Sequence, residues 1–105
     1  MPVAHYAGRT VLIDADGFLT DSSLWTPDVA EAIAAEAGIA PLTSEHWTVL
    51  ALCREDAAQR GFPPCLKRLS ALTGLSELLL GQLFPGSPGP LAARIAGLPW
   101  PRGRQ

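Results

Sequence analysis

Glycine and proline residues divide this chain into short segments, and their positions limit the fold more than any other feature of the sequence. The 105 residues include ten glycines and ten prolines. Proline breaks the interior of a helix, and glycine commonly follows a helix's last turn. The apolar segments between these breakers have the lengths of single short helices. We therefore expect one small domain, residues 1–105, that is mainly α-helical.

Five segments have the features of helices. Apolar residues recur at helical spacing in residues 28–37, and Gly38 follows as a stop signal. Thr43 stands where an N-cap would begin a second helix over residues 44–59. Three shorter helices are expected over residues 64–72, 76–83 and 90–96, the fourth helix with Ser76 as its cap.

A β-hairpin is expected near the N-terminus. Residues 10–13 are apolar and β-branched, residues 14–17 read Asp-Ala-Asp-Gly, and residues 18–20 return to extended character. A two-stranded hairpin is marginal alone, so it must pack against the helices. The predicted fold is a small orthogonal helical bundle that carries one N-terminal hairpin.

The last nine residues, 97–105, are unsuited to a helix. They contain two glycines, two prolines and two arginines, and we expect them to leave the domain as an extended, basic arm. Trp100 stands between Pro99 and Pro101 with no apolar neighbours to form a core. Two interpretations stay open for it: the indole fills a pocket of a partner, or it folds back on its own domain.

Composition excludes several classes of protein. Hydrophobic residues make up 48% of the chain and charged residues 17%, with a net charge of −2. These values disfavour a disordered chain and give no long-range attraction for nucleic acid. The sequence has neither the pattern of a signal peptide nor an apolar run of the ~20 residues that a membrane span needs. We expect a soluble, cytoplasmic protein that associates with no membrane.

The two cysteines have neither the spacing of a metal site nor that of a disulfide framework, so no metal and no cofactor are expected. Cys53 falls inside a predicted helix and is expected to pack as a small hydrophobe. Cys65 is a weak candidate for a reactive thiol, because helix N–H groups and the nearby Lys67 and Arg68 lower a thiol's pKa. His46 has no nucleophile beside it, and a packing or capping role is expected.

Several uncommon residue types occur in an order that resembles one known family, the DsrC/TusE sulfur-relay proteins. The resemblance extends from about Val11 to Pro101. It implies a DsrC-like helical fold with an extended C-terminal arm. The residues that carry it are Asp14-Ala15-Asp16-Gly17, Trp25, Glu45-His46-Trp47, Leu83-Phe84-Pro85 and Ile95-Ala96-Gly97-Leu98-Pro99.

The resemblance also implies which positions would carry sulfur. In the family, a persulfide is held on the penultimate cysteine of the arm, and dissimilatory members have a second cysteine eleven positions earlier. These positions are here Arg104 and Ala93. Persulfide transfer requires a thiolate on a segment that a partner can reach. An arginine or an alanine cannot substitute for it.

The family's basic residues around the arm imply a surface for a partner. Lys67 and Arg94 match basic family positions, whereas other such positions hold Ala71, Leu72 and Pro90. The residues expected to bind a partner are Lys67, Arg94, Trp100, Arg102 and Arg104. By resemblance, that partner is a sulfurtransferase complex of the tRNA 2-thiouridine relay or a protein like dissimilatory sulfite reductase.

Three functions remain open at this point. The first is a protein that is not an enzyme, carries no sulfur and acts as a regulatory or partner-binding paralogue in sulfur trafficking. The second is a sulfur carrier that uses Cys65 or Cys53. The third is a DNA-binding regulator, because residues 64–83 have the spacing of a helix-turn-helix. Its would-be recognition helix has no basic residue, which makes binding of nucleic acid unlikely.

Overall fold

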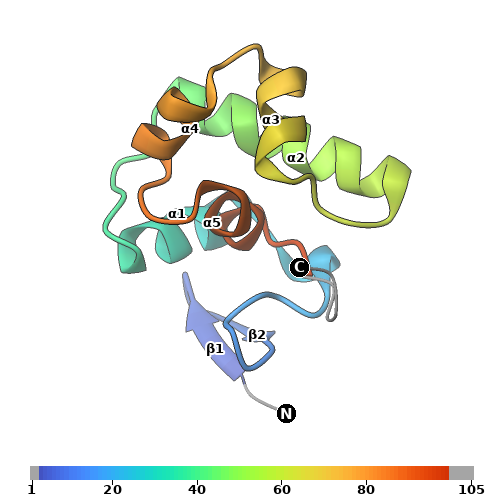
Figure 1. Cartoon of the computed structure of the whole chain (residues 1–105). Helices are drawn as coiled ribbons and strands as arrows, with labels where there is room; N and C mark the ends of the chain where they lie inside the picture. The colour runs from blue at the N-terminus through green and yellow to red at the C-terminus, as the bar shows by residue number, and fades with distance from the viewer. Residues whose placement is uncertain (1–2, 100–105) are drawn as a thin grey trace.

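A two-stranded sheet, a 3₁₀ helix and five α-helices form the described part of the chain, which is residues 3–99 of the computed structural model. Figure 1 shows α5 in the middle of the molecule, with α2, α3 and α4 to one side of it and the hairpin to the other. The elements are β1 Val3–Tyr6, β2 Arg9–Leu12, η1 Ser22–Leu24, α1 Pro27–Glu36, α2 Ser44–Arg60, α3 Leu66–Thr73, α4 Glu77–Leu83 and α5 Pro88–Ile95.

Helix α5 is the centre of the core. It packs against α1, α2, α3 and α4. Its buried positions are mostly small residues, which let neighbouring helices approach closely; a Cβ on Gly89 would lie 3.4 Å from the backbone nitrogen of Leu66. The largest fully buried side chains among the described residues are Phe84, Leu19, Ile33, Leu50, Leu69, Leu80 and Ile95. No helix within residues 3–99 has both the length and the apolar character to cross a membrane.

The predicted helices are confirmed, with shifts at two starts. Thr43 and Ser76 cap α2 and α4, each accepting a backbone N–H through its hydroxyl. Helix α3 begins at Leu66 instead of residue 64, because Cys65 is still extended and serves as the N-cap. Helix α5 begins earlier than predicted, at Pro88, since proline fits the first turn of a helix.

The prediction of the hairpin was wrong in its strands. The sheet pairs β1 with β2, and the turn between them holds Ala7 and Gly8 at φ values of 54° and 77°. Positive φ at both central residues is the requirement of the tight type I′ turn. The predicted pairing is reduced to one bridge between Ile13 and Leu19. The Asp14 carboxylate accepts two backbone N–H groups of the loop, which makes residues 14–18 a turn instead of a strand end.

His46 has the capping and packing role that the sequence predicted. Its Nδ1 accepts the backbone N–H of Thr43 at 3.0 Å, and its Nε2 lies 2.8 Å from the carbonyl oxygen of Leu83. The first contact makes Nε2 the protonated nitrogen, which donates to that carbonyl. The ring also meets Phe84 edge to face, with centroids 5.2 Å apart. His46 therefore joins the start of α2 to the end of α4.

A buried carboxylate joins α2 to α3. Asp56 is 4% exposed, and its oxygens accept from Nε and Nη2 of Arg68 at 2.6–3.0 Å, while Arg60 lies 3.5 Å away. These charge-assisted hydrogen bonds, above all those from Arg68, hold the pKa of Asp56 below its ordinary value of 3.8. The ionised form of Asp56 therefore stabilises the folded state.

We predict that Asp56→Asn lowers the melting temperature at neutral pH and that its difference from the wild type disappears in acid. The folded-state pKa is depressed, so the contribution of Asp56 is complete above the unfolded pKa near 3.8 and is lost as the pH falls through the folded value. Thermal unfolding followed from pH about 7 to about 2 measures this. The control is Glu55→Gln, an exposed acid on the same helix. Equal effects of the two substitutions would contradict the prediction.

Candidate functional site

The C-terminal end of α5 leads into the tail. Backbone N–H groups of the residues that follow the helix bind some of the carbonyl groups at this end. A helix leaves its last four carbonyl groups without intrahelical partners. Here the N–H of Leu98 donates to the carbonyl of Ala93 at 3.0 Å, and the N–H of Gly97 donates to that of Arg94 at 3.1 Å. With Gly97 at a φ of 72°, this is the Schellman arrangement.

Two side chains from distant segments satisfy the remaining carbonyls. The indole Nε1 of Trp25 donates to the carbonyl of Ile95 at 2.8 Å, and Nη1 of Arg54 donates to that of Ala96 at 2.7 Å. The guanidinium of Arg54 also lies over the indole ring of Trp25, 4.2 Å from its centroid. We call Trp25, Arg54 and Gly97 the root clamp. Every terminal carbonyl of α5 has a donor as a result.

Gly97 lies directly against the side chain of Trp25. A Cβ at this position would lie 2.2 Å from Cδ1 of Trp25, far inside van der Waals contact. The next residue, Leu98, is only 5% exposed. Residues 97 and 98 are thus part of the packed domain, which moves the start of the predicted arm from Gly97 to Pro99.

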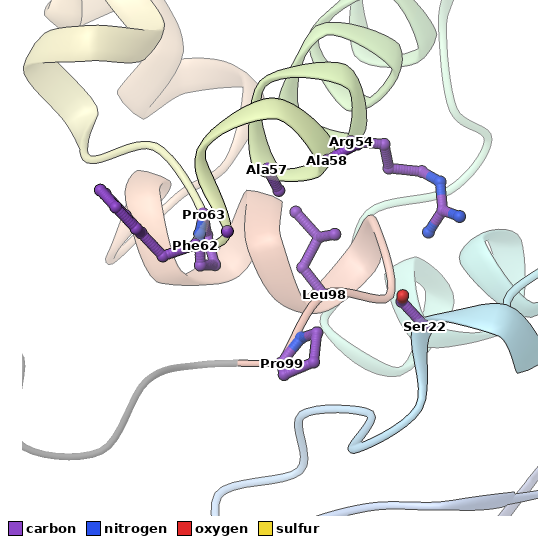
Figure 2. A pocket seen from close by; sticks show the side chains of 9 residues that line it. Ser22, Arg54, Ala57, Ala58, Phe62, Pro63, Leu98 and Pro99 are labelled. Atoms are coloured by element: carbon purple, nitrogen blue, oxygen red, sulfur yellow. The ribbon is translucent and has the colours of Figure 1, made fainter.

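A groove of about 450 Å³ opens beside the root clamp. Figure 2 shows the side chain of Leu98 pointing toward Ala57 and Pro63, with Arg54 and Ser22 at one end of the groove. The lining is mostly apolar, and the last described residues of the chain form one of its walls. The lining residues are Ser22, Arg54, Ala57, Ala58, Gly61, Phe62, Pro63, Leu98 and Pro99.

The predicted partner-binding residues do not gather at one place. Lys67 is exposed on α3. Arg94 is turned inward: its Nη2 donates to the Glu36 carboxylate at the end of α1, and its Nε lies over the backbone of Gly17. A role for Arg94 in binding a partner therefore stays a prediction. The other three, Trp100, Arg102 and Arg104, lie outside the described residues.

Most of the described positions linked to sulfur chemistry are inaccessible to solvent. Ala93 is fully buried in α5. Cys53 is fully buried in α2, as predicted, and burial raises the pKa of its thiol to about 12. Cys65 is exposed at the N-cap of α3, where its side chain makes no capping hydrogen bond. Within the part of the chain described, no three potential ligand side chains come together as a metal site.

The helix-turn-helix interpretation gains no support from the structure. Helices α3 and α4 are joined by a short turn, but α4 carries no lysine or arginine. On α3, the guanidinium of Arg68 is committed to Asp56, which leaves Lys67 as the exposed cation of this pair of helices. Such a surface lacks the basic residues that contact phosphates.

The sequence predicted neither the role of Trp25 nor that of Arg54. Their partners are 70 and 42 residues away along the chain. No local pattern in the sequence indicates contacts between residues so far apart. The end of the last helix was predicted correctly, because Gly97 follows it directly.

Comparisons with known proteins agree on one family. A family model described as "DsrC like protein" matches residues 5–104. Sulfite reductase, dissimilatory-type subunit gamma, of Nitratidesulfovibrio vulgaris is 32% identical over 103 residues, which is 98% of each chain. Sulfurtransferase TusE of Pectobacterium atrosepticum is 34% identical and covers 92% of this chain and 94% of its own.

Known structures give the same result for the fold. The oxidized gamma-subunit of the dissimilatory sulfite reductase (DsrC) from Archaeoglobus fulgidus is 32% identical and superposes with a TM-score of 0.81, over 99% of this chain and 100% of its own. DsrC of Allochromatium vinosum is 29% identical, with a TM-score of 0.84 over 98% of this chain and 97% of its own. The whole described domain therefore has the shape of these proteins.

We predict that Gly97→Ala destabilises the protein much more than Gly38→Ala. Both glycines follow a helix with positive φ, and a side chain there costs roughly 1–2 kcal/mol. A Cβ at Gly38 meets open space, whereas one at Gly97 overlaps Trp25, and this adds about 1–3 kcal/mol. Chemical denaturation of both variants measures the difference. Equal losses would mean that Gly97 does not rest on the indole in solution.

Proposed function

Because this chain belongs to the DsrC family, we propose that it is a sulfur-relay protein that binds a partner through its tail without carrying sulfur. The resemblance places the family's carrier thiols at Ala93 and Arg104, and the chain's two cysteines lie elsewhere. The observation that carries the proposal is the location of those cysteines. Cys53 is sealed in the core, and Cys65 lies on the body of the domain, at the start of α3. Neither is on the tail.

The packed root of the tail supports a binding role. Trp25 and Arg54 hold the end of α5, and Gly97 sets the direction in which the chain leaves. A fixed root reduces the conformational freedom that a tail loses when it enters a partner. The domain thus has a fixed root from which a tail can be presented, and the resemblance places Arg104 where the family has a thiol.

The partner we propose is a protein of the kinds that the relatives' names describe, either a sulfurtransferase or a protein like dissimilatory sulfite reductase. Arg102 and Arg104 suit an entrance lined by carboxylates or by an anionic cofactor. A tail that binds there without reacting would block or sense the site instead of passing sulfur. We therefore propose an accessory or regulatory protein without enzymatic activity, which works without a cofactor of its own.

A second candidate, a sulfur carrier, is favoured by one observation. Cys65 is exposed at the N-cap of α3, where a partner can reach its thiol. Unlike a thiol on a tail, it sits on a rigid helix start. Only a partner that reaches the body of the domain would load it.

Incubation of the reduced protein with a persulfidated sulfurtransferase, followed by intact-mass measurement, separates these two functions. We expect no gain of sulfur by the wild-type chain, since its exposed thiol is not on the tail. Arg104→Cys restores a thiol at the family's position and is expected to gain the mass of one sulfur atom, which confirms that the donor is active. A gain by the wild type that is lost in Cys65→Ser would establish the carrier function instead.

The same set of proteins reports partner binding. Wild type is expected to bind the sulfurtransferase or the sulfite reductase at least as tightly as Arg104→Cys does when no sulfur is supplied. A double substitution, Arg102→Gln with Arg104→Gln, is expected to weaken binding and to reduce its dependence on salt. Binding that is unaffected by the double substitution would contradict a role for the tail.

A further inference from the structure

We propose that the groove beside the root clamp binds a small monocarboxylate, a ligand with an apolar body whose carboxylate pairs with Arg54. The volume of about 450 Å³ falls within the range of pockets that enclose small ligands. All of its lining residues belong to the described domain, so the site exists whether or not the tail binds a sulfur-relay partner.

Arg54 lacks the counter-charge that comparable arginines of the domain have. Three arginines are half-buried within residues 3–99. Arg68 is paired with the carboxylate of Asp56, and Arg94 is paired with that of Glu36. Arg54 forms no ion pair in this part of the chain, and its Nη1 donates to an uncharged backbone carbonyl. Burial lowers the pKa of Arg54, because its charge is partly removed from water. A bound carboxylate would supply the missing negative charge.

Donors remain at this end of the groove for a carboxylate. A guanidinium carries several N–H groups, and the structure uses one of those of Arg54 on the end of α5. The group lies over the indole of Trp25, 4.2 Å from the ring centroid, which fixes its plane. Figure 2 shows the Ser22 hydroxyl at the same end of the groove. Among the described residues this hydroxyl has no hydrogen-bond partner, so it can donate to the same ligand.

The rest of the lining suits an apolar chain or ring. Ala57, Ala58, Pro63 and Leu98 provide alkyl surface, and Arg54 is the one charged side chain of the lining. Pockets fix a ligand's orientation with a few polar groups placed in a mostly apolar wall. One cation at one end of an apolar groove therefore matches a ligand with a single anionic end.

A second groove shows that size and apolar lining alone do not select this ligand. It has a comparable volume of about 470 Å³ and lies at the end of α1. Its lining is apolar except for Glu31, whose charge would repel a carboxylate. The two grooves differ mainly in the sign of their charge, which makes the second an internal control.

The experiment is titration of the full chain with octanoate, below the concentration at which it forms micelles, followed by ¹H–¹⁵N NMR. We expect saturable shifts at the amides of Gly61 and Leu98 and at the side-chain Nε–H of Arg54. The amides of residues 39–42 in the second groove should stay in place. Because Arg54 also caps α5, the charge is best removed from the ligand: octanol should bind about tenfold or more weakly than octanoate.

Ala58→Leu fills the groove from an exposed position of α2 and is expected to weaken octanoate binding by about tenfold or more. Ala35→Leu is the matched control, because Ala35 is likewise an exposed helical alanine that lines the second groove. It should leave the affinity unchanged. The indole N–H signal of Trp25, which caps α5, reports that both variants stay folded.

Four results would overturn the proposal. The first is a set of shifts that grows without saturating. The second is octanol that binds as tightly as octanoate, and the third is an affinity that Ala58→Leu leaves unchanged. The fourth is movement of the groove's amide signals when the ligand-free protein is diluted, which would show that a second copy of the chain occupies the groove.

Discussion

The capping of α5 by two remote side chains is the interaction on which this small domain depends most. Helix α5 touches four other helices, so its end cannot fray without disturbing the core. Trp25 and Arg54 satisfy the two carbonyls that the backbone turn leaves open. An unpaired buried carbonyl costs about 1–3 kcal/mol, a large share of the stability of a chain this short. The same contacts bring η1 and α2 together at the point where the tail begins.

The proposed function separates two tasks, presenting a tail and carrying sulfur. Presenting a tail requires a fixed root, which Gly97 and its neighbours provide. Carrying sulfur requires a thiol that a partner can reach, and the resemblance places Arg104 where that thiol would be. Under the proposed function, the chain would occupy a relay site without advancing the relay.

Local sequence signals predicted most of the helices. The features that the sequence did not predict depend mainly on contacts between residues far apart in the chain. The hydroxyls of Thr43 and Ser76 cap the helices they were predicted to cap, because a cap interacts only with residues two or three positions away. The hairpin was misplaced because Ala7 adopts the positive φ of its turn, which alanine does not signal. Gly97 marked a helix end, but the indole of Trp25 beneath it depends on chain folding that no local pattern encodes.

The most direct test of this account is hydrogen exchange at the amides of Gly97 and Leu98, which close the end of α5. If the root clamp fixes the tail, both amides exchange about as slowly as that of Ala96 within the same turn. Trp25→Phe, which removes the indole donor, should then speed up their exchange by about tenfold or more. Rapid exchange in the wild type, or rates that Trp25→Phe leaves unchanged, would show that the tail is not held at this root.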